Sequence, residues 1–229
     1  MSAKSLVDEY SQRRANSFTA KLRRWIAPPR LFLLNPREPN DFPMGRWNLY
    51  LGGGGANPDG YVNVDLFAVP DVDVAADIEM LPFRADLFQR IECDAVLEHV
   101  KHPEIAMDEM IRVLAPGGYL HLVTPFCHPF HAYPDDYRRF TPAGLRELSG
   151  GRLEVIAEGW RTGPAATMLI LGIEFVKSWL PGKIWRGGVH VILGWLLFPL
   201  RYLDLIFLRT PRAGNIGNHC YLWLRKPIY

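Results

Sequence analysis

The stretch "LYLGGGGANPDGYVNVDL" (residues 49–66) decides the fold of this chain. Two short apolar runs of strand character flank four consecutive glycines and a turn sequence, and the second run ends near Asp65. Glycine loses more conformational freedom on folding than other residues, so a run of glycines between two strands needs a reason. In an open α/β sheet such a loop lies beyond the carboxyl ends of the strands, where the missing Cβ atoms let a ligand approach the backbone. The stretch therefore predicts a ligand site at this edge of a parallel sheet.

The rest of the chain repeats an alternation of strand and helix patterns from Arg46 onward, which is typical of parallel strands joined by crossover helices. Strands are expected over 47–51, 61–66, 72–78, 90–96, 119–125, 152–160 and 219–227. Helices are expected over 103–118 and 140–151, because a proline opens each and glycines end each. The prediction is an α/β fold: a Rossmann-like, mostly parallel sheet with helices on both faces.

A strongly apolar segment lies between the last two expected strands, at about 164–210. Its longest uncharged run, 187–200, has 14 residues, fewer than the roughly 20 that cross a bilayer. We expect a C-terminal apolar helical insert. It is either an interfacial, membrane-associating helix pair or an ordinary buried hairpin, and the sequence leaves both open.

Charge is unevenly distributed along the 229 residues, although the net charge is only +2. Residues 1–30 carry seven basic and two acidic side chains, and residues 181–229 carry seven and one. We expect 1–45 to be a basic N-terminal arm and 46–229 to be the domain. The basic ends are suited to peripheral contact with anionic lipid. The alternative is that these charges are simply solvated on the surface. No pattern of basic and aromatic residues indicates nucleic-acid binding.

Cysteine use and the N-terminal sequence suggest a compartment. The three cysteines are widely spaced without a CxxC pair, so neither a disulfide framework nor a structural zinc site is expected. Residues 1–25 contain no apolar run of the kind a secretory signal needs. The expected location is cytoplasmic, with peripheral contact at the inner face of the membrane. The oligomeric state cannot be read from the sequence.

The spacing between the glycines and Asp65 limits the type of cofactor. A carboxylate at the end of the second strand can accept hydrogen bonds from a ribose diol. Dinucleotide sites place this acid about 20 residues beyond the glycines, because a full helix that binds the pyrophosphate lies between them. Here Gly52 and Asp65 are 13 residues apart. A full helix does not fit, which favours an adenosine cofactor without phosphates over NAD or FAD.

Four motifs in order carry a family resemblance: "LYLGGGG" (49–55), "DIEMLPF" (77–83), "CDAVLEHV" (93–100) and "IRVLAPGGYLHLVTP" (111–125). Together they resemble the motifs of class I S-adenosylmethionine-dependent methyltransferases, of the methyltransferase type 11 kind. The shortened first crossover is similar to that of bacterial proteins associated with surface-glycan synthesis. The resemblance implies S-adenosyl-L-methionine as cofactor.

The resemblance also implies which residues bind that cofactor. The set is Gly52, Gly53, Gly54, Asp65, Leu66, Asp77, Ile78, Cys93, Asp94 and His99. Asp65 would bind the ribose hydroxyls, whereas Asp77 and Ile78 would contact the adenine. Cys93 and Asp94 would close over the methionine end.

Two positions depart from the family pattern. Tyr50 stands where an acidic residue or asparagine is usual, and Ala56 stands where a third glycine is common. The first departure removes an expected partner of the methionine amino group. The alternative to an enzyme is therefore a non-catalytic methyltransferase-like binding protein in a membrane-associated glycan assembly system.

The acceptor side of the site is expected in "TPFCHPFHAYPDDYRRFT" (124–141), which follows the fifth strand. His131 or His128 is the candidate general base, since imidazole titrates near neutrality; structural hydrogen bonding is the alternative. Tyr137, Arg138 and Arg139 are the candidate substrate-binding residues, the alternative for the arginines being ion pairs with neighbouring aspartates.

No metal is predicted, because Cys127 with the two histidines of this stretch lacks a fourth ligand at useful spacing. The predicted reaction is methyl transfer from S-adenosylmethionine. The acceptor is expected to be an oxygen of a glycan, a lipid-linked molecule or another small molecule.

Overall fold

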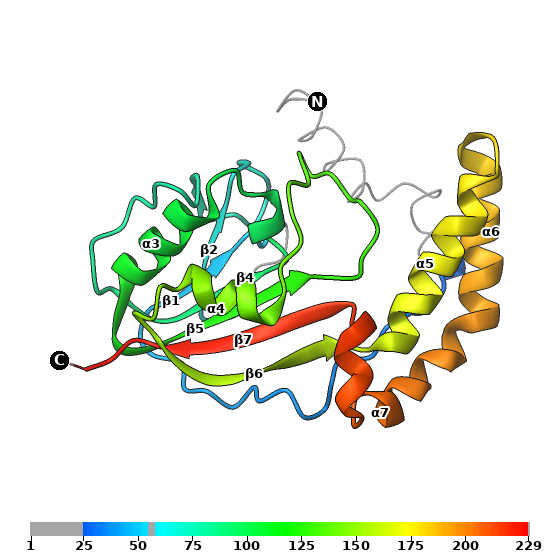
Figure 1. Cartoon of the computed structure of the whole chain (residues 1–229). Helices are drawn as coiled ribbons and strands as arrows, with labels where there is room; N and C mark the ends of the chain where they lie inside the picture. Colours follow the sequence, from blue (N-terminus) through cyan, green and yellow to red (C-terminus); the bar gives the residue numbers. More distant parts are fainter. Residues whose placement is uncertain (1–24, 55–57, 229) are drawn as a thin grey trace.

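The computed structural model describes residues 25–54 and 58–228. Within them, one sheet of seven strands has the order β3-β2-β1-β4-β5-β7-β6 (Figure 1). The strands are β1 (Asn48–Leu51), β2 (Val62–Asp65), β3 (Val74–Ala75), β4 (Phe88–Asp94), β5 (Leu114–Pro125), β6 (Glu154–Thr162) and β7 (His219–Arg225). β1 to β5 pair in parallel, whereas β7 lies antiparallel between β5 and β6. The predicted Rossmann-like, mostly parallel sheet is confirmed, and each predicted strand is present.

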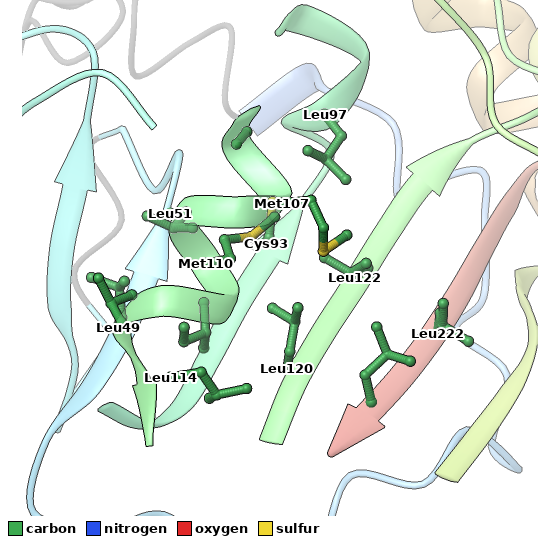
Figure 2. Close-up of a cluster of buried hydrophobic side chains, with 14 of the residues drawn as sticks. Leu49, Leu51, Cys93, Leu97, Met107, Met110, Leu114, Leu120, Leu122 and Leu222 are labelled. Carbon is green, nitrogen blue, oxygen red and sulfur yellow. The ribbon is translucent and has the colours of Figure 1, made fainter. Parts of the chain in front are cut away.

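The helix α3 (Pro103–Val113) packs on one face of this sheet, and α4 (Pro142–Leu148) lies beside it. Apolar side chains of α3 at helical spacing are buried against leucines of the strands and form the main core (Figure 2). The expected helix over 103–118 is too long, because β5 already begins at Leu114. Pro116 has no N–H for a helical hydrogen bond, and Gly117 has a φ of 77°. These two residues explain why α3 ends early.

The opposite face of the sheet is covered differently from the prediction. Among the described residues, α3 and α4 lie on one face, and the extended segment 31–47 crosses the other (Figure 1). Phe42 of this segment packs against Trp223 of β7, with ring centroids 4.3 Å apart. The backbone carbonyl of Phe42 accepts a hydrogen bond from Arg90 of β4 (2.6 Å). Residues 31–47, here called the strap, thus cover this face of the sheet, where the prediction placed helices.

A buried charged cluster fixes the strap to the sheet. Nδ1 of His121 lies 2.6 Å from Glu92, and its Nε2 lies 3.0 Å from Glu38 of the strap. Burial opposes the charged imidazole, yet the hydrogen bonds to the two carboxylates outweigh it and raise the pKa of His121. Burial likewise raises the pKa of Glu92, but the bonds from His121 and Arg90 lower it overall. The residues therefore form an ion pair beneath the aromatic ring of Trp223, which stacks on His121.

The apolar insert is a helical hairpin that begins where β6 ends (Figure 1). It comprises α5 (Pro164–Ser178), α6 (Gly182–Leu197), η2 (Phe198–Leu203) and α7 (Asp204–Phe207), and η3 (Pro211–Ile216) leads back to β7. The buried carboxylate of Asp204 accepts hydrogen bonds from the N–H groups of Ala165 and Ala166 (2.8 and 3.0 Å), which satisfies the first turn of α5. These hydrogen bonds connect the start of α5 to the start of α7.

Many large apolar side chains of the hairpin are exposed. Ile184, Trp185, Ile192 and Leu196 are between 66% and 88% exposed. In the described part of the chain, one continuous helical stretch, Gly182–Phe207, has 26 residues and contains an 18-residue window with a mean hydropathy of 1.5, which is enough to cross a membrane by length and composition. The uncharged run counted from the sequence was shorter, because charged residues near both ends of this helix interrupt it.

Candidate active site

A pocket of about 350 Å³ lies at the carboxyl ends of β1, β2 and β4. Its walls come from the loops after these strands, from η1 (Leu97–His99) and from the loop after β5. The lining includes Gly52, Asp65, Leu66, Phe67, Asp77, Ile78, Val96, His99, Tyr133 and Tyr137. The first glycine and both acids of the predicted cofactor site thus meet in one pocket.

Gly52 is required at the turn out of β1. Its φ of 70° lies in the left-handed region that glycine tolerates. A Cβ atom at this position would lie 2.2 Å from Cγ2 of Val96, which is closer than atoms approach. The backbone at Gly52 therefore forms a bare surface of the pocket, because no side chain fits there.

Asp65 joins the glycine loop to the end of β2. Its Oδ2 accepts a hydrogen bond from the N–H of Gly54 (2.9 Å), and its Oδ1 accepts one from the N–H of Phe67 (3.0 Å). An ionised carboxylate has about four acceptor positions, so further acceptor positions are left for a ligand. The residue holds the loop in place and also lines the pocket.

Asp77 and Ile78 form another part of the wall. Oδ1 of Asp77 accepts a hydrogen bond from the N–H of Glu79 (2.9 Å), which turns the chain after β3. An acceptor oxygen and a branched apolar side chain then stand next to each other in the lining. This pairing suits a flat heteroaromatic ring with an exocyclic amine.

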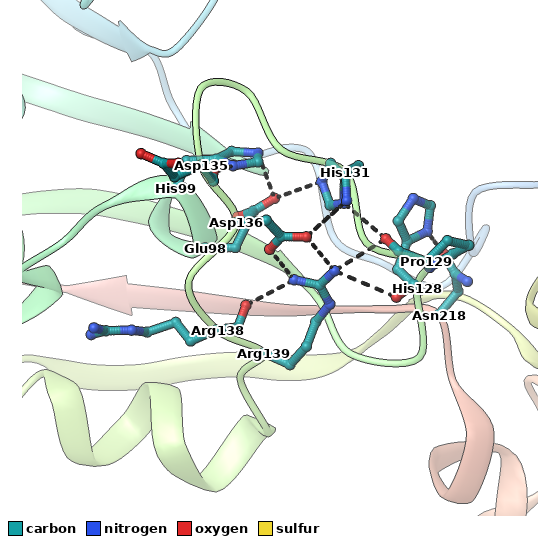
Figure 3. Close-up of polar contacts among 10 residues, drawn as sticks. All are labelled: Glu98, His99, His128, Pro129, His131, Asp135, Asp136, Arg138, Arg139 and Asn218. Atoms are coloured by element: carbon teal, nitrogen blue, oxygen red, sulfur yellow. Dashed lines mark hydrogen bonds and ion pairs between the residues drawn. The ribbon is translucent and has the colours of Figure 1, made fainter. Parts of the chain in front are cut away.

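The loop after β5 is held by Arg139 (Figure 3). Its guanidinium pairs with Asp136 (2.7 Å) and donates to the carbonyl of Pro129 (3.1 Å). The hydrogen bond from Arg139 is the largest influence on Asp136 and keeps the pKa of that carboxyl well below its usual range. Arg139 thus has a structural partner for its charge and does not line the pocket.

Known proteins are similar to part of this chain. Residues 61–122 match the family model of the methyltransferase domain. The chain is 32% identical over 126 residues to a demethylmenaquinone methyltransferase of Mycobacterium tuberculosis, covering 51% of this chain and 53% of the relative. It is 41% identical over 112 residues to that of Renibacterium salmoninarum, covering 48% and 43%. The chain therefore spans about half the length of these curated relatives.

Solved structures share the architecture across nearly the whole chain. The cyclase SpnF superposes with a TM-score of 0.53 at 17% identity, covering 99% of this chain and 93% of that one. A phosphoethanolamine N-methyltransferase of Haemonchus contortus, solved with S-adenosylhomocysteine, gives 0.52 at 15%, covering 99% and 60%. The fold is that of a class I methyltransferase. With the domain match, the predicted enzyme class, an S-adenosylmethionine-dependent methyltransferase, and its predicted cofactor are confirmed at the level of this domain.

Several predicted cofactor residues lie outside the pocket of the methyltransferase domain. Gly53 and Gly54 follow β1 and do not line the pocket, and Cys93 is buried in the main core. Asp94 is absent from the lining and pairs with Arg161 of β6 (2.8 Å). The backbone of Ala95 is left-handed (φ 55°), and Ala95 and Val96 line the pocket.

Some of the residues predicted to act on the acceptor line the pocket, and others lie outside it. Tyr137 lines the pocket, and its hydroxyl donates to Asp135 (3.0 Å). Arg138 is half-buried, does not line the pocket, and donates to the carbonyl of Lys101 (3.0 Å). His128 and His131 do not line the pocket, whereas His99 does. Nδ1 of His128 lies 3.0 Å from Oδ1 of Asn218, which is a structural hydrogen bond of the kind named above as the alternative to a general base.

The two positions that depart from the family pattern have different outcomes. Tyr50 packs edge-on against Tyr61 at 5.9 Å, and burial, with the charge of Asp94 second, raises its pKa to about 12. It is therefore a neutral phenol outside the pocket lining. Ala56 lies outside the described residues.

Sequence reasoning missed the aromatic side of the pocket. Phe67 and Tyr133 lie edge-on to each other there, with ring centroids 6.5 Å apart, although they are far apart in the chain. Phe67 comes two residues after Asp65, so its position next to the β2 motif was a signal that it could line the same site. Tyr133 reaches the pocket only because the long loop after β5 folds back over it.

Proposed function

We propose that this protein transfers a methyl group from S-adenosylmethionine to a small acceptor held at a membrane surface. The observation that supports it is the shared pocket of Gly52, Asp65 and Asp77. In this proposal Asp65 accepts from the ribose diol, and Asp77 accepts from the adenine amine while Ile78 covers the ring. The sulfonium is already activated, so the domain mainly aligns the acceptor with the methyl group.

A quinol-type ring is the first candidate acceptor. The curated relatives at 32% and 41% identity are named for a quinone substrate. Phe67, Tyr133 and Tyr137 give the pocket an aromatic wall that suits such a ring. In the reaction, the acceptor supplies the electron pair of the new bond to the methyl carbon, S-adenosylhomocysteine leaves, and the acceptor loses a proton. His99 is the histidine of the pocket, and His131, the base predicted from sequence, packs against its ring.

A lipid-linked glycan hydroxyl is the second candidate acceptor. It is favoured by the polar loop 127–139 next to the pocket, which offers hydrogen-bond donors and acceptors such as Arg138 and Asp135. The surface-glycan subgroup suggested by the short first crossover remains part of this second candidate.

Membrane contact is proposed through the hairpin, at the cytoplasmic face. β6 runs parallel to β5, because both are antiparallel to β7. The hairpin therefore leaves the sheet at the same carboxyl edge at which the pocket opens. Its exposed apolar residues and the nearby Lys183 and Arg186 fit an anionic bilayer surface. A membrane-borne acceptor would then reach the pocket without leaving the lipid completely.

The membrane proposal predicts vesicle binding that depends on one face of α6. Trp185, Ile192 and Leu196 share this face and are 68%, 66% and 68% exposed. Replacing all three by serine is expected to weaken partition into phosphatidylglycerol–phosphatidylcholine vesicles at least about 100-fold, because each large side chain contributes about 1.5–3 kcal/mol when fully buried. Vesicle sedimentation measures the effect.

A matched control replaces apolar residues of similar exposure elsewhere. Met80 and Ile228 are 77% and 71% exposed and lie outside the hairpin. The Met80→Ser, Ile228→Ser variant is expected to bind vesicles like the parent. Equal loss in both variants, or no binding by the parent, contradicts the membrane proposal.

Cofactor and acceptor are tested together with the whole chain. Calorimetry is expected to show S-adenosylhomocysteine binding, and labelled methyl from S-adenosylmethionine is expected in the quinone fraction of a membrane extract. Label in the glycolipid fraction selects the second candidate. Absence of cofactor binding at millimolar concentration would favour the non-catalytic binding protein.

A further inference from the structure

Glu98 is a buried carboxylate without a conventional partner. Its side chain is 0% exposed, although it lies at the start of the short helix η1 beside the pocket. Neither carboxylate oxygen has a hydrogen-bond partner within the described part of the chain. Burying a charged or polar group without such a partner costs free energy, so buried carboxylates are normally paired or bind a cation.

Two imidazoles face this carboxylate (Figure 3). Nε2 of His99 lies 3.6 Å from Oε1 of Glu98, and Nε2 of His131 lies 3.5 Å from the same oxygen. These separations exceed normal hydrogen-bond distances. The three side chains come from η1 and from the loop after β5, so they converge from two segments of the chain.

The other nitrogen of each imidazole is bound to the backbone. Nδ1 of His99 lies 2.5 Å from the carbonyl oxygen of Asp135, and Nδ1 of His131 lies 3.1 Å from that of Pro129. A carbonyl only accepts hydrogen bonds, so each Nδ1 carries the proton in the neutral ring. Each Nε2 then carries a lone pair and lies within 3.6 Å of Oε1 of Glu98. Backbone carbonyls orient metal-binding histidines in the same way.

We propose that Glu98, His99 and His131 bind a divalent transition-metal cation, with Zn²⁺ as the first candidate. In a tetrahedral site, bonds of about 2.0–2.2 Å place ligand atoms roughly 3.4 Å apart. The two nitrogen–oxygen separations, 3.5 and 3.6 Å, match this spacing. One ligand atom from each residue lies within 4.8 Å of the others. Three protein ligands leave a fourth position open.

The ligand set differs from the one considered in the sequence. That set grouped Cys127 with His128 and His131, and it lacked an acid. His128 is instead bound to Asn218 (3.0 Å), and the acid comes from Glu98, which is 33 residues before His131 in the chain. The sequence could not show this triad because tertiary folding brings the loop back onto η1.

The open position has a use if the proposed function holds. His99 also lines the pocket, so the cation would lie at its wall. A hydroxyl of the acceptor that binds there would lose its proton more readily, because the cation stabilises the oxyanion. This use rests on the proposed methyl transfer, whereas cation binding itself does not.

Cobalt binding tests the proposal directly. The whole chain is treated with a chelator, dialysed and titrated with Co²⁺, with d–d absorption as the readout and Zn²⁺ as competitor. We expect one equivalent to bind with the strong visible absorption of a tetrahedral site. Glu98→Gln and His131→Gln are each expected to weaken binding at least about 10-fold, because losing a hydrogen-bond partner of a metal ligand already costs about 10–100-fold and these side chains would bind the cation directly.

His102→Gln is the matched control. This histidine lies in the same segment, its side chain is 46% exposed, and its distance to Glu104 is 3.9 Å. The His102→Gln variant is expected to bind Co²⁺ like the parent. Co²⁺ affinity that is equal in the parent and in His131→Gln overturns the proposal and leaves a Glu98–His131 ion pair as the explanation. S-adenosylhomocysteine calorimetry on the same samples separates this failure from failure of the proposed function, and circular dichroism confirms that each variant is folded.

Discussion

Replacing Asp65 by alanine is expected to weaken S-adenosylmethionine binding at least about 100-fold. In the proposed complex the carboxylate accepts two hydrogen bonds from the ribose diol, and bonds to charged groups contribute about 1.5–3 kcal/mol each. The substitution also releases the N–H groups of Gly54 and Phe67, which Asp65 holds at 2.9 and 3.0 Å. Both effects act on the same pocket, so the loss is expected in cofactor affinity. Isothermal calorimetry with S-adenosylhomocysteine measures it.

Two further variants make this result specific. Asp59→Ala removes an exposed acid from the turn between the glycines and β2, and it is expected to leave cofactor affinity unchanged. Asp65→Asn retains one acceptor oxygen and is expected to have intermediate affinity. If Asp65→Ala binds the cofactor as well as Asp59→Ala does, the assignment of this pocket to S-adenosylmethionine fails.

Replacing His121 by leucine is expected to lower the free energy of unfolding by about 3 kcal/mol, because breaking a buried ion pair leaves an uncompensated charge. The side chains of His121, Glu38 and Glu92 are only 5%, 8% and 11% exposed. Arg90 remains 2.6 Å from Glu92, and Arg161 remains 3.5 Å from Glu38, which keeps the expected loss at the lower end of such effects. Chemical denaturation of the two proteins gives the difference.

A double-variant cycle identifies the source of that loss. Glu38→Gln combined with His121→Leu is expected to be less destabilised than the two single changes added together, since the two residues share one interaction. His102→Leu changes an exposed histidine and is expected to leave stability nearly unchanged. A similarly small effect of His121→Leu would show that the cluster does not hold the strap on the sheet.

The stabilisation by this cluster should depend on pH. The pKa of His121 is raised above its ordinary value of 6.5 in the folded protein, so its contribution is fully present below that value and is lost as pH rises through the folded pKa. The pKa of Glu92 is lowered from 4.5, so its contribution is present above that value and is lost as pH falls through the folded pKa. The difference between the parent and His121→Leu is therefore expected to be largest between pH 4.5 and 6.5.

The sequence by itself determined the sheet and the core of the proposed cofactor site. Strand patterns depend on neighbouring residues, and each predicted strand is present, although β3 is shortened to Val74–Ala75. The short distance between Gly52 and Asp65 ruled out a helix between them, and the structure joins β1 to β2 without a helix in the described residues. Because parallel strands end at one edge, their terminal glycine and acid had to meet.

Only the tertiary structure decided what lies around that core. The strap with Glu38, the pairing of Asp94 with Arg161, and the triad of Glu98, His99 and His131 join residues that are distant in the chain. The exposure of α6 was equally undetermined, because an apolar helix has the same composition whether it is buried or not. Local patterns specify backbone conformation, whereas contacts between distant segments depend on how the finished sheet and its loops pack together.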